Sequence, residues 1–139
     1  MTRGTGKILG IDMGTKRIGL SLSNEEQTFA FPLKTLEIVQ VSKNLEGIAN
    51  QIGVIAHENA AKDIVIGESK AFSGVDNPIM KHVHALKPLL EAQSFDVHLI
   101  PEFMTSAEAG RFQGNIDLLD ASAAAIILQT YLDKLADQA

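Results

Sequence analysis

The sequence contains no cysteine and no tryptophan among its 139 residues. Without cysteine it can form no disulfide, no thiolate zinc site and no cysteine nucleophile, so any bound metal must be held by oxygen or imidazole ligands. It also lacks an apolar run near the roughly 18 to 20 residues of a membrane-spanning helix, and its first residues lack the apolar core of a signal peptide. Together these absences predict a cytoplasmic protein that does not associate with membranes.

Positive charge is also scarce. The 12 Lys and Arg residues are outnumbered by 17 Asp and Glu residues, for a formal net charge of −5, which argues against a protein that coats nucleic acid through a broad basic face. The shortage is uneven, because the first 17 residues hold four of the cations and one acid, namely Arg3, Lys7, Lys16 and Arg17 against Asp12. The charge distribution therefore leaves room for a locally basic site.

The length and composition predict a single domain spanning residues 1–139. A chain of this size can bury roughly two-thirds of its unfolded surface, and its 45% hydrophobic and 21% charged residues are ordinary for a folded protein. No repeat and no tract rich in proline and serine suggests a linker. We therefore expect one compact domain.

Hydrophobic periodicity predicts five strands and a set of helices. Apolar, β-prone residues favour strands over 7–13, 17–23 and 28–36, with Pro32 suggesting an edge position for the third. An apolar run at 63–67 reads as a buried strand parallel to the first. The remaining elements are a helix from 41 to about 57 capped by Ser42, a helix starting at 77–78, a strand at 95–101, a short helix from Thr105 to about Gly114 and a last helix at 117–136. The order βββαβαβα predicts an α/β fold with a mixed five-stranded sheet and helices on its faces.

The first strand delivers one carboxylate, Asp12, at its end. Because side chains alternate along a strand, Asp12 shares a face with Ile8 and Gly10, and Gly10 leaves room beside the acid. Such a group at a sheet rim suits a divalent cation. The alternative is that Asp12 merely opens an Asx-turn before Gly14.

The turn after Asp12 carries groups that suit a phosphate. Gly14 is able to adopt a positive φ there, Thr15 offers a hydroxyl, and Lys16 and Arg17 supply two cations. Backbone donors and positive charge would thus lie beside an anionic, metal-binding group. We expect these four residues to bind substrate, the alternative being that Lys16 and Arg17 are solvated surface charges.

The last predicted helix carries a second unexplained acid. Asp120 begins a stripe that also contains Ala123, Ala124, Ile127, Leu128, Tyr131, Leu132 and Leu135. The small residues Ala123 and Ala124 would let the helix approach the sheet closely, so Asp120 could share a metal with Asp12. Asp117 is expected only to cap this helix. His82 and His84 stand two apart on a helix and cannot face one metal, so histidine ligands are not expected.

Three segments resemble one family. Residues 10–19 (GIDMGTKRIG) resemble the opening signature of the YqgF family, nucleases similar to Holliday junction resolvases with an RNase H-like fold. Residues 120–132 (DASAAAIILQTYL) resemble the closing motif of that family, and residues 101–106 (PEFMTS) resemble its DERLTS segment. The resemblance extends over residues 8–132. A weaker likeness, to the first phosphate loop of actin, Hsp70 and sugar kinases, would require a second lobe that this length does not provide.

The resemblance implies a metal-dependent endonuclease. Its catalytic and metal-binding residues would be Asp12, Glu102 and Asp120, holding Mg²⁺ or Mn²⁺. The implied substrate is structured nucleic acid, foremost the 5′ end of precursor 16S ribosomal RNA in ribosome biogenesis. Alternatives are a Holliday junction resolvase acting in DNA recombination and a catalytically impaired nucleic-acid-binding module of the same fold. The protein would be a monomer or a homodimer.

Several positions depart from the family pattern. Pro101 stands where the family usually has Asp, and Phe103 stands where it has Arg. The cation expected near the scissile phosphate is therefore either missing or supplied by Arg111 or Arg17. No Lys precedes the acid of the closing motif. Glu68 ends the predicted fourth strand, where it could add a further metal ligand.

Overall fold

The computed structural model describes residues 6–14, 16–38, 44–70, 80–103 and 116–138. The predicted element order and fold class are confirmed. The predicted start of the second helix at 77–78, the capping residue Ser42 and the short helix after Thr105 lie outside these residues. The elements are β1 (Lys7–Met13), β2 (Arg17–Ser23), β3 (Ala30–Glu37), α1 (Leu45–Glu58), β4 (Ala61–Lys70), α2 (Met80–Glu91), β5 (Asp96–Phe103) and α4 (Ile116–Gln138).

The five strands form one sheet in the order β3-β2-β1-β4-β5. β1 pairs antiparallel with β2 and parallel with β4, as predicted, and β5 continues the parallel half. β3 lies at an edge, and its register with β2 shifts between Leu20 and Ser21, where Pro32 enters the pairing. Proline lacks a backbone N–H for the ladder, so an edge strand with an irregular register accommodates it.

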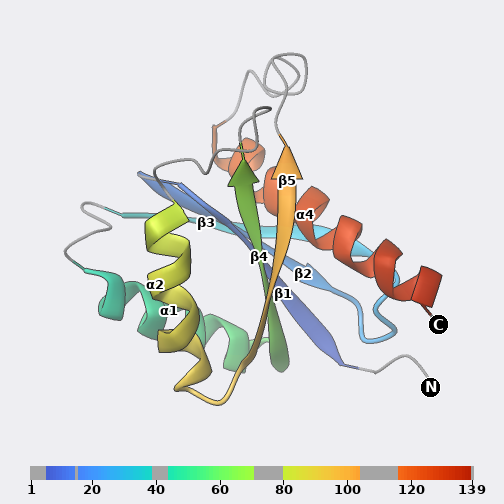
Figure 1. The fold of residues 1–139 in the computed structure, drawn as a ribbon, viewed down its shortest axis with the longest axis horizontal. Coiled ribbons are helices and arrows are strands. Elements are labelled where there is room, and N and C mark those ends of the chain that lie inside the picture. The colour runs from blue at the N-terminus through green and yellow to red at the C-terminus, as the bar shows by residue number, and fades with distance from the viewer. Residues whose placement is uncertain (1–5, 15, 39–43, 71–79, 104–115, 139) are drawn as a thin grey trace.

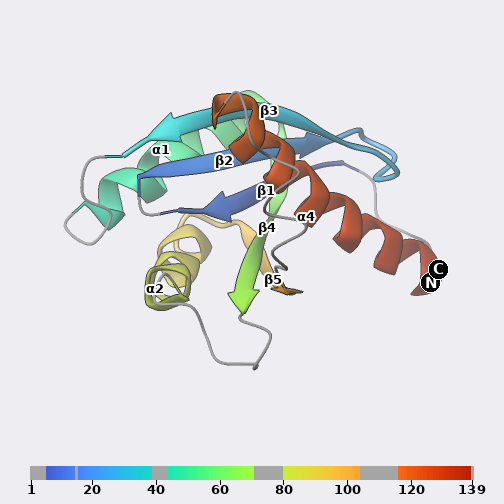
Figure 2. The same ribbon diagram turned by 90° about the horizontal axis from the view of Figure 1, so that it is seen from above.

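The sheet separates two hydrophobic cores. α1 and α2 pack on one face and α4 packs on the other (Figures 1 and 2). Leu9 and Ile11 of β1 point into the larger core under α1 and α2, whereas Ile8 points into the smaller core under α4. The alternation predicted for β1 is therefore confirmed, and the α4 face is the one that Asp12 shares with Ile8 and Gly10.

Two elements, α1 and β4, differ most from their predicted bounds. α1 begins at Leu45 rather than near residue 41, with Asn44 at its N-cap position making no side-chain capping hydrogen bond. β4 extends from Ala61 to Lys70, beyond the predicted 63–67, because it pairs with β1 on one side and with β5 on the other. Backbone hydrogen bonds to these strands keep polar residues at both ends of β4 in the sheet, although hydrophobic periodicity alone assigns them to loops. No helix in the described ranges is both long and apolar enough to cross a membrane.

α4 lies close to the backbone of β1 and β2 because small residues face it. A Cβ atom added at Gly10 would lie 2.9 Å from Cβ of Leu128, and one added at Gly19 would overlap the carbonyl oxygen of Asp120. The buried Ser21 hydroxyl donates a 2.8 Å hydrogen bond to the carbonyl oxygen of Ala124. The expectation of close approach is correct for Ala124, which is fully buried, whereas Ala123 is half-buried and the buried Ala121 was missed.

Ser21→Ala is expected to lower the free energy of unfolding by about 1 kcal/mol, the usual net contribution of a hydrogen bond. The substitution removes the link between β2 and α4 and leaves the helix seated by its apolar contacts. Thr130→Ala is the matched control, because the Thr130 hydroxyl donates to the carbonyl oxygen of Ile126 in its own helix at an exposed position. Urea unfolding of both variants measures the difference; an equal effect of the two would show that the Ser21 bond does not hold α4.

Candidate active site

Asp12 lies near the end of β1, on the sheet face covered by α4. Its carboxylate is half-buried, and its cross-strand partner in β2 is Gly19. Residues directly opposite each other in an antiparallel pair have Cα atoms about 4.5 to 5.5 Å apart. Gly19 is therefore the β2 residue beside Asp12 on the α4 face.

Asp120 reaches the same place from the other end of the chain. It lies in the first turns of α4, and its carbonyl oxygen packs against the position where a side chain of Gly19 would begin. Gly19 is thus the common neighbour of Asp12, through strand pairing, and of Asp120, through backbone packing. The structure brings these two predicted site residues together, and the absence of a side chain at Gly19 is what permits it.

Arg17 forms an ion pair with Asp120. Its Nε atom donates to Oδ2 of Asp120 over 3.0 Å, and the two side chains are 33% and 26% exposed. The pair joins the first residue of β2 to α4. Arg17 is therefore not a solvated charge of the hairpin but part of the surroundings of a predicted metal ligand.

The other residues of the turn are placed differently. A Cβ atom at Gly14 would overlap the carbonyl oxygen of Arg17. Gly14 does not adopt the positive φ that the sequence analysis allowed for; among the described glycines, Gly6 has a positive φ. Gly14 thus provides space rather than an unusual conformation. Lys16 is exposed, with its carbonyl oxygen accepting a hydrogen bond from the Ile38 N–H at 2.9 Å. Thr15 lies outside the described residues.

Glu102 is placed by its backbone alone. It pairs with Ser69 near the end of β5, and its side chain lies outside what the structure describes, as does that of Phe103. β1, β4 and β5 are parallel, so their carboxyl ends reach one edge of the sheet. Asp12 and Glu102 therefore lie toward the same edge, separated by β4.

Glu68 does not end its strand, contrary to the sequence prediction. β4 continues to Lys70, and position 68 alternates with Gly67, whose Cβ direction meets Ile127 of α4. Position 68 instead follows Ile64 and Ile66, which point into the core under α1 and α2. Strand alternation thus assigns Glu68 to the sheet face opposite Asp12, which removes the reason for counting it as a further ligand.

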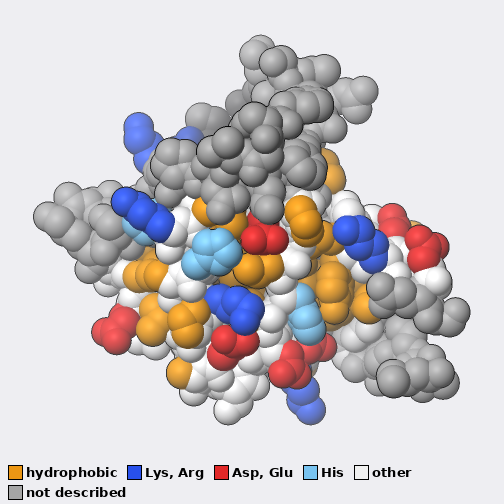
Figure 3. Space-filling view, viewed as in Figure 1, with side chains coloured by type: hydrophobic (Ala, Val, Ile, Leu, Met, Phe, Trp, Pro, Cys, Tyr) orange, Lys and Arg blue, Asp and Glu red, His pale blue; other side chains and the backbone are white. Residues whose placement is uncertain are grey.

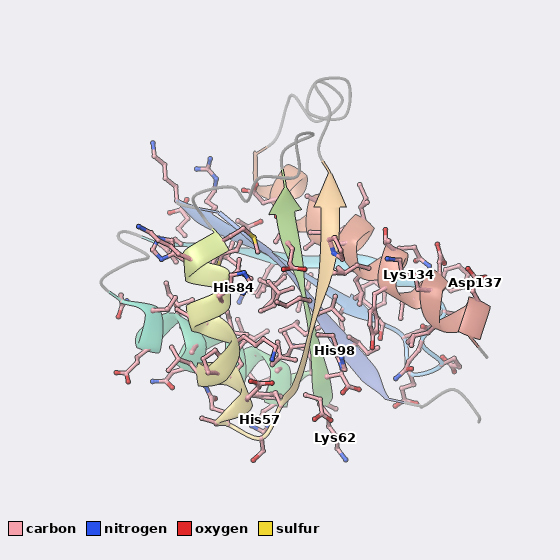
Figure 4. The ribbon with its side chains drawn as sticks, viewed as in Figure 1. His57, Lys62, His84, His98, Lys134 and Asp137 are labelled. Carbon is pink, nitrogen blue, oxygen red and sulfur yellow. The ribbon has the colours of Figure 1, made fainter. Side chains whose placement is uncertain are left out.

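The four histidines lie on three elements, and His82 and His84 share α2. Figure 4 shows His57, His84 and His98 on α1, α2 and β5. The His98 ring stacks on Tyr131 with ring centroids 5.4 Å apart, and its Nε2 atom lies 3.8 Å from Oδ1 of Asp63. Burial raises the pKa of Tyr131 above its ordinary value, and the negative charge of Asp63 raises this pKa further. This cluster is near the start of β4, away from Asp12.

The two acidic residues beside Gly19 carry the kind of oxygen atoms that suit a hard divalent cation. Asp12 and Asp120 provide carboxylate oxygens, which Mg²⁺ and Mn²⁺ prefer, and such ions are commonly held by one or two carboxylates together with water. Within the described side chains, which exclude that of Glu102, no group of three His, Asp or Glu residues gathers around one point. The residues present therefore fit a metal held by two carboxylates, with Glu102 as the candidate third.

The fold has the RNase H-like architecture of RuvC. The structure of RuvC from Thermus thermophilus superposes with a TM-score of 0.62 at 13% identity, covering 94% of this chain and 96% of that one. T. thermophilus RuvC in complex with a Holliday junction substrate gives a TM-score of 0.61 at 13% identity, covering 95% of this chain and 96% of that one. At these identities the likeness establishes the architecture alone.

The family follows from the sequence comparisons. A family model described as "RuvX: Holliday junction resolvase" matches residues 6–134. A protein of Maridesulfovibrio salexigens named "Putative pre-16S rRNA nuclease" is 33% identical over 135 residues, covering 91% of this chain and 97% of its own. A protein of the same name from Moorella thermoacetica is 30% identical over 138 residues, covering 93% and 96%. The chain belongs to the RuvX family, a family of hydrolytic nucleases.

Proposed function

We propose that this protein is a metal-dependent endonuclease that hydrolyses phosphodiester bonds in precursor 16S ribosomal RNA and matures its 5′ end. The observation that carries the proposal is the meeting of Asp12 and Asp120 at Gly19, on the α4 face of a RuvX-family sheet. A pair of carboxylates in that setting is what a nuclease needs to hold a divalent cation beside a phosphate. The relatives named for precursor 16S rRNA support the choice of substrate.

Each site residue has a proposed role. Asp12, Glu102 and Asp120 hold Mg²⁺ or Mn²⁺, with Asp12 as the anchor because it stands on the central strand. When bound, the metal polarises the phosphate and lowers the pKa of water. Gly14, Thr15 and Lys16 bind the phosphodiester backbone through backbone N–H groups, a hydroxyl and an exposed cation. Arg17 supplies the cation that the family pattern places where Phe103 stands here.

Binding is expected to depend on this local charge. Among the described side chains on the face shown in Figure 3, Lys and Arg are separated by acidic, hydrophobic and other side chains and form no continuous basic surface. With a net charge of −5, the protein should bind nucleic acid with modest, salt-sensitive affinity, contacting few phosphates. We place it in the cytoplasm, where ribosomal RNA precursors would meet it.

A second candidate substrate is a four-way DNA junction. The family description and the fold shared with RuvC favour it, and carboxylates that act at the phosphate do not distinguish ribose from deoxyribose. Symmetric cleavage of a junction would require a homodimer, whereas cleavage of one RNA strand would not. A third candidate is a nucleic-acid-binding module with impaired catalysis, because Phe103 stands where the family has Arg. An experiment must distinguish it from the two nucleases.

The test is cleavage of a substrate panel by the purified protein. A 5′ fragment of precursor 16S rRNA, a four-way DNA junction and an unstructured RNA of equal length are incubated with Mg²⁺, Mn²⁺ or EDTA. We expect cutting of the precursor at a defined position, lost in EDTA. Preferential cutting of the junction would replace ribosomal RNA by DNA as the substrate, and binding of either without cutting would overturn the nuclease proposal.

A further inference from the structure

We propose that Arg17 is the counter-ion of Asp120 when no metal is bound, and that it exchanges this carboxylate for a substrate phosphate as the metal enters. The inference rests on the proposed function and adds to it an order of events. Its basis is the 3.0 Å contact between Nε of Arg17 and Oδ2 of Asp120, a carboxylate that the proposed site needs for its cation.

The contact uses a small part of what Arg17 offers. A guanidinium group carries five N–H donors in a planar fork, and the hydrogen bond to Asp120 is donated by Nε. The terminal nitrogens are therefore able to engage a phosphate in two parallel hydrogen bonds, the geometry that guanidinium groups favour. Because the side chain is 33% exposed, a ligand arriving from solvent can reach it.

Arg17 forms its ion pair with Asp120 rather than with the carboxylate that lies opposite it in the neighbouring strand. Its cross-strand partner in β3 is Glu37, an exposed residue, yet the ion pair goes to Asp120, which is 26% exposed. A charge pair is stronger where water is partly excluded. Arg17 is therefore paired with the less exposed carboxylate, which a neighbouring cation stabilises more when no metal is bound.

Competition between Arg17 and a metal follows from electrostatics. Both need the negative charge of Asp120, and a fixed positive charge within a few ångströms lowers the affinity of a site for a divalent cation. A substrate phosphate would draw Arg17 away and add negative charge of its own. Metal binding and nucleic-acid binding should therefore be positively coupled, each raising the affinity for the other by the same factor.

The test compares Mn²⁺ affinity, measured by electron paramagnetic resonance and calorimetry, with RNA affinity in EDTA for the 5′ fragment of precursor 16S rRNA. Arg17→Gln is expected to bind Mn²⁺ about tenfold more tightly and the RNA several-fold more weakly. A merely structural role for Arg17 would lower both affinities, so the opposite signs are the signature. Arg17→Lys, which keeps the charge, should bind Mn²⁺ nearly as the wild-type protein does.

Two controls locate the effect. Lys16→Gln removes the exposed neighbouring cation and should weaken RNA binding while changing Mn²⁺ affinity less than about twofold. In an Asp120→Asn background, Arg17→Gln should raise the Mn²⁺ affinity less than about threefold. The carboxylate through which Arg17 affects the metal is then absent, so the double-mutant cycle measures its share of the effect.

The outcomes separate this inference from the proposed function. Mn²⁺ binding by the wild-type protein with no gain in Arg17→Gln overturns the inference and leaves the nuclease proposal standing. A gain in Arg17→Gln without cleavage of any substrate supports the inference and removes the nuclease proposal. Failure of both proteins to bind Mn²⁺ overturns both.

Discussion

Asp12→Asn is expected to abolish metal-dependent cleavage and leave the fold intact. Asparagine has nearly the same size and keeps one oxygen, so a half-buried position at the end of β1 can accept it. It loses the negative charge that would anchor a cation. Because replacing an outer-shell partner of a metal ligand already costs about 10- to 100-fold, we expect the loss of the ligand itself to lower the cleavage rate at least about 100-fold.

The measurement is the initial rate of substrate cleavage in Mg²⁺ and Mn²⁺, together with thermal unfolding to establish that the variant is folded. Asp137→Asn is the matched control, since Asp137 is an exposed acid near the far end of α4 (Figure 4). It should cleave at the wild-type rate. A folded Asp12→Asn protein that keeps more than a tenth of the wild-type rate would contradict the assignment of Asp12 as a metal ligand.

Gly19→Ala is expected to lower the free energy of unfolding by about 2 to 3 kcal/mol, the cost of forcing extra volume into a packed position. The new methyl group would overlap the carbonyl of Asp120, which is backbone and has no side-chain freedom with which to yield. α4 would have to move off β2, taking Asp120 away from Asp12. Cleavage should therefore fall more steeply than stability explains.

Urea unfolding and cleavage rates, both measured where the variant remains folded, test this expectation. Gly47→Ala is the control, because its Cβ atom would meet the side chain of Asn44 on the surface of α1. That side chain is able to turn aside, and alanine favours a helix over glycine by about 1 kcal/mol, so this variant should be at least as stable as the wild type. A Gly19→Ala protein as stable and active as the wild type would show that α4 does not need the bare backbone of β2.

Local sequence patterns determined much of this protein. Apolar, β-prone runs over 7–13 and 17–23 predicted β1 and β2 with their observed bounds, because a strand covered on both faces is apolar on both. Side chains alternate between the faces of any strand, and this placed Asp12 on the face of Ile8. The 3.6-residue period of the last helix predicted that Asp120 begins the stripe that packs on the sheet. Family motifs then singled out these acids together with Glu102, and the metal-binding roles of all three stay predictions.

Only the tertiary structure decided how these parts meet. That Gly19 lies between Asp12 and Asp120, that Arg17 pairs with Asp120, and that Glu68 follows the opposite sheet face depend on strand register and on the placement of α4. Arg17 and Asp120 are separated by 103 positions, and no local period relates residues so far apart. Helix and strand periods specify which face a residue occupies, but contact between faces is set by packing of the whole chain, which requires small residues where two backbones approach.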